Sequence, residues 1–512
     1  MVFTNKISEE KLQSLPFMDE DLDIEERVDD FLNRLTLEEK ISLLSGKRIF
    51  FSDRIKRLRM PYFKMTDGPH GVGSGIFYLK KMTYFPVAIC RAATWNPTLS
   101  HEFGKALAQE TRATGRHLIL APGINIIRTP LCGRNFEYQT EDPYLNKKLA
   151  VQMVKGVQSQ KIGACVKHYA ANNQEYKRFR ISAEISERAL EEIYYPAFKA
   201  TVEEADAWSF MACYNRFNGV FGCENEELIR EKLINEWGFT GFVVSDWFAT
   251  RYTDTLGCLK AGLSLEMPRA ICYKEKKVKK ALSMNKVSEE LLDENLKRLL
   301  RIMFLTGVFD DPATLPKGSR NTEEHQLIAK KIAEEGIVLL KNQDNLLPLD
   351  VNATSSIAIL GPNANEKMAF GGGSSMVRAK YEVTPEKGLE NKVKGKIKIV
   401  KKPEEADVAI LFAGLNHDKH NDRENKDRLR LELPQEQIKL IKKTVRKNSN
   451  TIVVLINGSP VAMNEWIDDV PAILEAWYAG MEAGTVIADI LFGDLNPSGK
   501  LPVTFPKNLK DS

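Results

Sequence analysis

GFVVSDW, residues 241–247, is the stretch that decides the fold. Its apolar and β-branched run FVV follows a glycine, which predicts a buried strand of a parallel sheet. Ser245 and Asp246 come at the point where this run stops. In barrels and open α/β sheets, reactive groups lie at the carboxyl ends of such strands. Asp246 is therefore a candidate catalytic carboxylate, and its alternative role is to cap the next helix. The indole of Trp247, directly after it, could stack on a sugar ring.

Outward from this strand, short apolar runs alternate with helical segments. A capping box from Thr36 to Glu39 predicts the first of these helices, and the segment 187–205 is amphipathic with a helical period. The runs predicted as strands are YFKMTD (62–67), VAICRAATW (87–95), HLILAPGINI (117–126), ACVKHYAANN (164–173), WSFMACYN (208–215), FVVSDW (242–247) and LSLEM (263–267). This alternation predicts a (β/α)8-barrel-like domain.

A second α/β pattern follows a linker-like segment at 312–322. It begins with a helix at 321–336, for which Asn321 is the expected N-cap. The runs predicted as strands are IVLLKN (337–342), IAILGP (357–362), KIKIV (396–400), VAILFAG (408–414), TIVVLIN (451–457) and AILEAWY (472–478). We therefore expect a lead-in at 1–40, the barrel-like domain at 41–308, a linker at 309–330 and an α/β sandwich domain at 331–512.

Composition narrows the class of protein. The chain has 512 residues, enough for two or three domains, and its 73 Lys+Arg against 69 Asp+Glu are too balanced and dispersed to indicate a nucleic-acid partner. It lacks the run of about 18 apolar residues that a membrane span needs. The start, MVFTNKISEEKLQ, has no signal-peptide core, and the seven cysteines contain no CxxC pair, so we expect reduced thiols and a cytoplasmic location.

No cofactor or metal is expected either. Dinucleotide-binding glycine signatures are absent, and GGGSS (371–375) follows a loop rather than a strand, which argues against a phosphate cradle.

Polar motifs cluster at the predicted strand ends of the first domain. They are MTDGPHGV (65–72), LCGRNFEYQTEDPYL (131–145), KHYAANN (167–173), CYNRFNG (213–219) and SDW (245–247). Each one has a plain structural alternative: Asp67 begins a turn signature, Arg134 could pair with Glu137 or Glu141, and Lys167-His168 could form a buried ion-pair element.

Together with AGLNHDKHNDRENKDRLRLELP (413–434) and GDLNPSGKLPVTFP (493–506), these motifs resemble glycoside hydrolase family 3, β-glucosidase branch. The resemblance runs from about residue 20 to the end of the chain. In that family's acid/base loop, a Glu lies three residues before an Asp-Arg pair, and Leu-x-Leu-Pro follows. Here these positions are Glu424 and Asp427-Arg428.

The resemblance implies that Asp246 is the nucleophile that forms a glycosyl-enzyme and that Glu424 is the general acid, then base. A retaining glycosidase needs one ionised and one protonated carboxyl group, about 5–5.5 Å apart. The cations Lys167 and Arg134 are expected to favour the ionised form of Asp246. Because Glu424 belongs to the second domain, we expect the site to lie between the domains.

The resemblance also implies which residues bind the sugar. They are Asp67, accepting from two hydroxyls at the far end of the non-reducing sugar; Arg134, Lys167 and His168, on its equatorial hydroxyls; Tyr214, supporting the nucleophile; Trp247, walling the sugar; and Ser374, touching it from the second domain.

Two departures concern the acid/base loop. It has two more residues between Gly414 and Glu424 than the family pattern, and it carries Asn425-Lys426 in place of a glycine and an aromatic residue. Asp422 and Asp427 are therefore alternative acids. The chain also stops without the fibronectin-type domain of many relatives, which indicates a minimal two-domain version or a truncated one.

The resulting hypothesis is a retaining, exo-acting β-glucosidase that acts on oligosaccharides or aryl and alkyl glucosides. The first alternative is a β-xylosidase or α-L-arabinofuranosidase of the same fold, but Asp67 favours a hexose because xylose lacks the C6 group. An N-acetylglucosaminidase would carry a KHxPGHG loop where this chain has KHYAANN. A non-catalytic sugar-binding relative is the remaining alternative. Whether copies associate as a homo-oligomer is left open.

Overall fold

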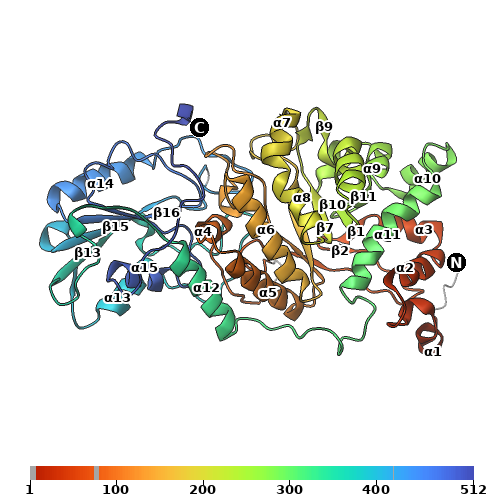
Figure 1. Cartoon of the computed structure of the whole chain (residues 1–512), viewed down its shortest axis with the longest axis horizontal. Coiled ribbons are helices and arrows are strands. Elements are labelled where there is room, and N and C mark those ends of the chain that lie inside the picture. The colour runs from red at the N-terminus through yellow and green to blue at the C-terminus, as the bar shows by residue number, and fades with distance from the viewer. Residues whose placement is uncertain (1–6, 74–79, 419, 512) are drawn as a thin grey trace.

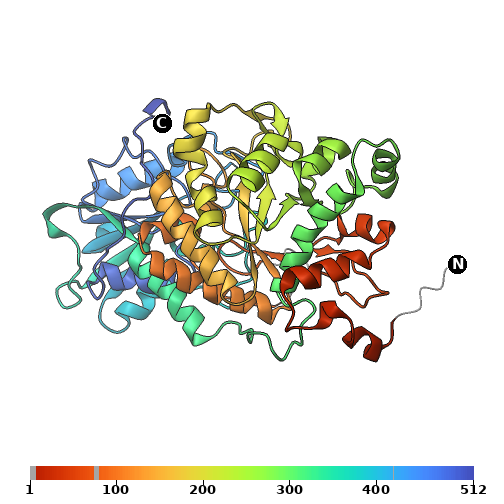
Figure 2. The ribbon, with the colours of Figure 1, turned by 45° about the vertical axis from the view of Figure 1, so that its right-hand side comes forward.

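The fold is built on two sheets that lie side by side, one in each half of the chain (Figures 1 and 2). We analysed a computed structural model, which describes residues 7–73, 80–418 and 420–511. This mixed α/β architecture in two parts confirms the predicted fold class. The exact boundaries proposed for the lead-in, barrel, linker and sandwich stay predictions.

The first sheet has six parallel strands in the spatial order β11-β10-β7-β5-β4-β3. Their bounds are β3 (Met65–Asp67), β4 (Leu118–Leu120), β5 (Gly163–Tyr169), β7 (Ser209–Ala212), β10 (Phe242–Ser245) and β11 (Leu263–Leu265). All residues of β5, β7, β10 and β11 are buried, as expected for a parallel sheet that helices cover.

A hairpin links the two edge strands of this sheet. It consists of β1 (Gly46–Arg48) and β2 (Phe51–Ser52), which pair antiparallel. Ser45 forms a parallel bridge with Glu266, just after β11, and Phe51 forms an antiparallel bridge with Lys64, just before β3. Among the described residues the ring therefore consists of six parallel strands, and the hairpin closes it. A (β/α)8 barrel instead has eight parallel strands.

One predicted strand of the first domain is wrong. The run at 87–95 forms a helix, α4 (Ala88–Ala93), whose residues are all buried. A short helix that is buried on every side, its one charged residue Arg91 included, shows no solvent-exposed polar face, so periodicity cannot distinguish it from a buried strand.

Helices cover the barrel and connect it to the second domain. The capping box of Thr36 and Glu39 is present at the start of α3. Thr322, not the expected Asn321, caps α12 by accepting from the His325 backbone N–H. The α-helices of this half and of the connection are α1 (Glu9–Gln13), α2 (Ile24–Asn33), α3 (Leu37–Leu43), α4, α5 (Pro97–Ala113), α6 (Pro143–Gln158), α7 (Glu187–Ala189), α8 (Pro196–Glu203), α9 (Thr255–Ala261), α10 (Glu275–Ser283), α11 (Glu289–Leu305) and α12 (Glu323–Gly336).

The second sheet contains every strand that the sequence predicted there, in the order β12-β17-β16-β15-β13-β14. Only the pairing of β12 with β17 is antiparallel within this sheet. Helix α14 lies on one face, and α13 and α15 lie on the other (Figure 1). The bounds are β12 (Val338–Asn342), β13 (Ser356–Leu360), β14 (Lys398–Val400), β15 (Val408–Gly414), β16 (Thr451–Ile456), β17 (Ala472–Glu475), α13 (Pro385–Val393), α14 (Gln435–Lys447) and α15 (Ala483–Leu491).

None of the helices in the described ranges combines the length and the apolar composition that a membrane span requires. The seven cysteines are all buried and unpaired.

Candidate active site between the two domains

The polar residues predicted in the first domain meet at the carboxyl edge of the barrel sheet. Asp67 is the last residue of β3, Lys167 and His168 lie near the end of β5, Tyr214 follows β7, and Asp246 directly follows β10. Because neighbouring strands are parallel, their carboxyl ends bring these side chains to one place.

Asp246 is buried, with 6% of its surface exposed. Its Oδ1 accepts the Trp247 backbone N–H at 2.7 Å. Its Oδ2 lies 3.5 Å from Nε2 of His168 and has no well-formed hydrogen bond within the described part of the chain. Burial raises the pKa of Asp246, opposed by the charges of Arg178 and Arg134 and by a hydrogen bond from Tyr214. Of the two cations expected here, Lys167 and Arg134, Arg134 contributes to this lowering, and the largest opposing charge is that of Arg178.

Burial raises the pKa of Asp67 to about 7, although the charge of Lys167 opposes this shift. The carboxylates Glu424 and Asp246 also raise it, which shows that the three acidic groups share one electrostatic environment. A carboxyl group in this position changes protonation near neutral pH.

His168 contacts Tyr138, and Lys167 lies near Glu137. Nδ1 of His168 is 3.1 Å from the Tyr138 hydroxyl, and burial together with Arg134 and Lys167 holds the pKa of His168 well below its usual value, so its ring is neutral. Nζ of Lys167 lies 3.9 Å from Oε1 of Glu137.

Arg134 does pair with Glu137, as its structural alternative predicted. Its Nε and Nη2 both contact that carboxylate, the second at 3.0 Å. Its remaining nitrogen, Nη1, lies 4.0 Å from Oε1 of Glu424. The Glu137 pair therefore orients a buried guanidinium toward the second domain's carboxylate.

Glu424 reaches this cluster from the loop that follows β15. Its backbone N–H donates to the Gly372 carbonyl at 2.8 Å, and its Oε2 accepts the Ser374 backbone N–H at 2.7 Å. Oε1 lies 2.8 Å from Nη2 of Arg178. Asn425 has φ 70°, a left-handed conformation that asparagine tolerates, which explains how it can occupy a position where the family has glycine.

The ionisation of Glu424 differs from the sequence-based expectation. Burial alone would raise its pKa, but Arg134, Arg178 and hydrogen bonds from Ser374 outweigh burial and hold the pKa well below the usual range. In this structure Glu424 is therefore ionised, whereas a general acid must carry a proton.

The two alternative acids, Asp422 and Asp427, both accept hydrogen bonds from other parts of the protein. Oδ2 of Asp422 accepts the Gly458 backbone N–H at 2.7 Å and the Tyr478 hydroxyl at 2.8 Å, and its Oδ1 accepts the Ser459 hydroxyl. Asp422 is fully buried in these contacts. It fixes the loop ahead of Glu424.

Asp427 joins the two domains. Its carboxylate accepts the backbone N–H groups of Gly133 at 3.1 Å, Glu175 at 2.9 Å and Tyr176 at 2.8 Å. All three donors belong to barrel loops, so Asp427 anchors the Glu424 loop to the first domain.

Arg178 is a site residue that sequence reasoning missed. Its Nη1 contacts Oε2 of Glu175 at 2.7 Å, its Nη2 contacts Glu424, and its guanidinium lies 4.3 Å from the centre of the Tyr214 ring. Arg178 lies in the loop that follows the strand with Lys167 and His168, and this position of a cation could have indicated it from the sequence.

Trp247 lies at the rim of the barrel. Its Nε1–H donates to the Ile49 carbonyl at 2.6 Å, and its ring centre is 5.4 Å from that of Phe50. The hairpin between β1 and β2 thus fixes the indole beside Asp246.

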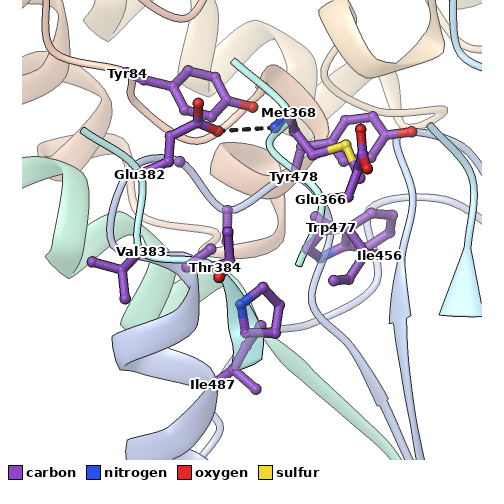
Figure 3. Close-up of a pocket in the computed structure, with 14 residues that line it drawn as sticks. Tyr84, Glu366, Met368, Glu382, Val383, Thr384, Ile456, Trp477, Tyr478 and Ile487 are labelled. Carbon is purple, nitrogen blue, oxygen red and sulfur yellow. Dashed lines mark hydrogen bonds between the residues drawn. The ribbon is translucent and has the colours of Figure 1, made fainter. Parts of the chain in front are cut away.

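A separate cavity of about 30 Å³ lies where the domains meet, near Tyr84 and Glu382 (Figure 3). Glu382 accepts the Met368 backbone N–H at 2.9 Å, and the buried Tyr84 hydroxyl has no hydrogen-bond partner among the described residues. This space admits water rather than a sugar, and no predicted site residue lines it. In the described ranges, no group of three or more His, Cys, Asp or Glu side chains could hold a metal ion.

Comparisons with known proteins agree with this architecture. The glycosyl hydrolase family 3 N-terminal domain matches residues 37–302, and the family's C-terminal domain matches 337–512. β-Glucosidase BoGH3A of Bacteroides ovatus is 36% identical, over 99% of this chain and 74% of that relative. An exo-α-(1→6)-L-arabinopyranosidase of Bifidobacterium breve is 35% identical, over 93% of this chain and 66% of its own length.

The structure of β-glucosidase 3B from Thermotoga neapolitana in complex with glucose superposes with a TM-score of 0.86 at 34% identity, over 94% of this chain and 76% of that one. The predicted glycoside hydrolase class is thereby confirmed, and the predicted β-glucosidase function agrees with these relatives. The chain belongs to glycosyl hydrolase family 3.

Proposed function

We propose that this protein is a retaining, exo-acting β-glucosidase in which Asp246 is the nucleophile and Glu424 the acid/base. The observation that carries the proposal is the pair of buried carboxylates supplied by different domains to one charged cluster. The charges of Arg134 and Arg178 lower the pKa of both groups, and the charge of Glu424 raises the pKa of Asp246. A buried carboxylate pair of this kind suits two-step glycoside hydrolysis.

In the first step, Oδ2 of Asp246 attacks the anomeric carbon of the sugar, and the glycosidic C–O bond breaks. This oxygen is buried and without a well-formed hydrogen bond among the described residues, so no strong interaction has to be broken for it to react. Glu424 gives its proton to the departing oxygen.

The ligand-free geometry leaves Glu424 ionised, whereas the first step of the reaction needs Glu424 protonated. The contact of 2.8 Å with Arg178 stabilises the ionised form of Glu424. Before the first step, therefore, this ion pair has to open and Glu424 has to take up a proton from solvent, which it then gives to the departing oxygen. In the second step an ionised Glu424 is what the reaction needs, because it takes a proton from the water that attacks the glycosyl-enzyme. The product is the β-anomer.

The sugar is proposed to be glucose, held by Asp67 at its C4 and C6 end and by Arg134, Lys167 and His168 on its equatorial hydroxyls. A neutral His168 can donate from one ring nitrogen, and the cation Lys167 donates to hydroxyl oxygens. Trp247 would cover one face of the ring, and Ser374 would contact it from the second domain.

A panel of p-nitrophenyl glycosides tests the proposal. We expect the β-glucoside to have the highest kcat/KM, ahead of the β-xyloside and of the α-L-arabinofuranoside and α-L-arabinopyranoside. Proton NMR during early hydrolysis should show the β-anomer first. Initial release of the α-anomer, or a xyloside turned over as well as the glucoside, would contradict the assignment.

We also propose that the protein works in the cytoplasm, because its seven cysteines are buried and unpaired. Fractionation of the native cells should find the activity with cytoplasmic markers. Whether the chain forms a homo-oligomer can be measured by light scattering.

A further inference from the structure

A groove of about 570 Å³ opens on the outside of the molecule between α5 and α12, which lie side by side in Figures 1 and 2. Nζ of Lys331 on α12 lies 4.0 Å from Oε2 of Glu102 on α5, and Nε2 of His325 lies 2.9 Å from Oε1 of Gln109. Residue numbers therefore rise along one helix as they fall along the other, so the two helices are antiparallel. No predicted site residue lines this groove, which is separate from the active site.

The middle of the groove is apolar. Leu327 on α12 is 64% exposed and lines the groove together with Ile328 and with Ala106 of α5. The buried side of α12 contains Ala329 and Ile332, so Leu327 is not part of the protein's own core. Complete removal of a leucine side chain from water contributes about 1.5–3 kcal/mol. A contact with another molecule can still gain this free energy at Leu327.

Charged residues of α12 flank this apolar middle with opposite signs. Glu323 and Glu324 precede Leu327 by four and three positions, and Lys331 follows it by four. All three charged residues line the groove and are exposed. Acidic residues at the start of a helix also stabilise the helix itself through its dipole, which accounts for the glutamates but not for the exposed leucine. The two charged residues that α5 adds to the lining are of opposite sign and leave this polarity in place: Lys105 and Glu102.

This polarity is complementary to itself. If a two-fold axis passes through Leu327, α12 of one copy lies antiparallel to α12 of the other, and Glu323 of each copy faces Lys331 of the other. The two charges lie at equal distances from the axis, about 6 Å along the helix at about 1.5 Å per residue. Such a contact uses the same surface on both copies, as two-fold dimers do. A parallel arrangement would instead place acid against acid and lysine against lysine.

We propose that the surface formed by α5 and α12 binds a second copy of this chain, so that the protein associates as a two-fold homodimer. Leu327 of each copy packs into the groove of the other, and the ends of the two α12 helices pair by charge. The helices have 17 and 14 residues, which gives lengths of about 25 and 21 Å. Side by side they cover roughly 400–500 Å² per copy, below the roughly 800 Å² of a standard interface, so the dimer is weak and reversible.

Light scattering and sedimentation of the full chain between about 1 and 200 μM test this contact. The wild type should change from monomer to dimer across this range. Leu327→Arg should raise the dissociation constant about tenfold or more, because it places two positive charges at the axis. Tyr144→Arg is the matched control, since Tyr144 is 67% exposed on α6 outside the groove, and it should leave the association unchanged. Circular dichroism should show that each variant is folded.

A charge exchange tests the pairing itself. Glu323→Lys alone sets two lysines against each other at both ends of the contact, and Lys331→Glu alone does the same with two glutamates. Each variant should therefore be monomeric at concentrations where the wild type is a dimer. An equimolar mixture of the two variants should dimerise, because both ends of the mixed dimer again join an acid to a lysine.

The outcomes decide the proposal in each case. A wild type that stays monomeric throughout this range would overturn it. A dimer that persists unchanged in Leu327→Arg and in both charge variants would also overturn it, because such a dimer forms through another surface. If each charge variant is monomeric and their mixture stays monomeric too, the antiparallel two-fold pairing is wrong.

Discussion

Replacing Arg178 with Met removes the cation that joins the two halves of the site. Its guanidinium contacts Glu175 at 2.7 Å and Glu424 at 2.8 Å, and only 5% of its surface is exposed. Removing one partner of a buried ion pair typically costs about 3–5 kcal/mol, because a buried charge is left uncompensated. Met retains much of the side-chain volume, so we expect a loss of this size in the free energy of unfolding near neutral pH, with little contribution from a cavity.

The loss should depend on pH in a definite direction. In the wild-type protein the pKa of Glu424 lies below its value of 4.5 in the unfolded chain, so its ion pairs stabilise the fold above about pH 4.5, and this stabilisation is lost as the pH falls. The charge of Arg178 also lowers the pKa of Glu175, which burial raises. In Arg178→Met both pKa values rise, and protonation relieves the buried charges as the pH decreases. The variant should therefore be most destabilised near neutral pH.

Urea unfolding at pH about 7.5 and about 5 measures this difference. Arg188→Met is the matched control, because Arg188 pairs with Glu192 at 2.9 Å in a position where its side chain is 84% exposed. It should change stability little at either pH. A loss below about 1 kcal/mol for Arg178→Met, or a larger loss at the acidic pH, would refute the reasoning.

The remaining predictions concern the reacting carboxylates and Asp67. Asp246→Asn should fold normally but lose activity by several orders of magnitude, and a 2-deoxy-2-fluoroglucoside should label Asp246 in the wild type; label on another carboxylate would remove it from the role. Glu424→Ala should slow cellobiose far more than dinitrophenyl glucoside, with azide restoring turnover as β-glucosyl azide; equal losses and no rescue would place the acid elsewhere. Because the pKa of Asp67 is raised to about 7, chiefly by burial, kcat/KM for glucosides should decrease as the pH falls below about 7, and Asp67→Asn should abolish that limb. A limb that persists unchanged in the variant belongs to another group.

The sequence by itself determined the elements whose signals are local. The run before Asp246 forms β10, the capping box at Thr36 begins α3, and every predicted strand of the second sheet is present. These features depend on β-branched runs, periodicity and side chains within a few residues of each other, so neighbouring letters are sufficient to predict them. Its family motifs also identified the glycosyl hydrolase family 3, which the comparisons confirmed.

Tertiary contacts decided what local signals could not. The run at 87–95 forms a helix that is buried on every side, so its sequence carries no helical period from which the helix could be predicted. The separate roles of Asp427, anchored to barrel loops, and of Arg178, bound to Glu424, rest on contacts between residues about 250 positions apart. The ionised state of Glu424 is likewise set by arginines of the other domain, which outweigh its own burial. Charge acts through space at short range, and only the packing of the two domains places those charges within reach of one another.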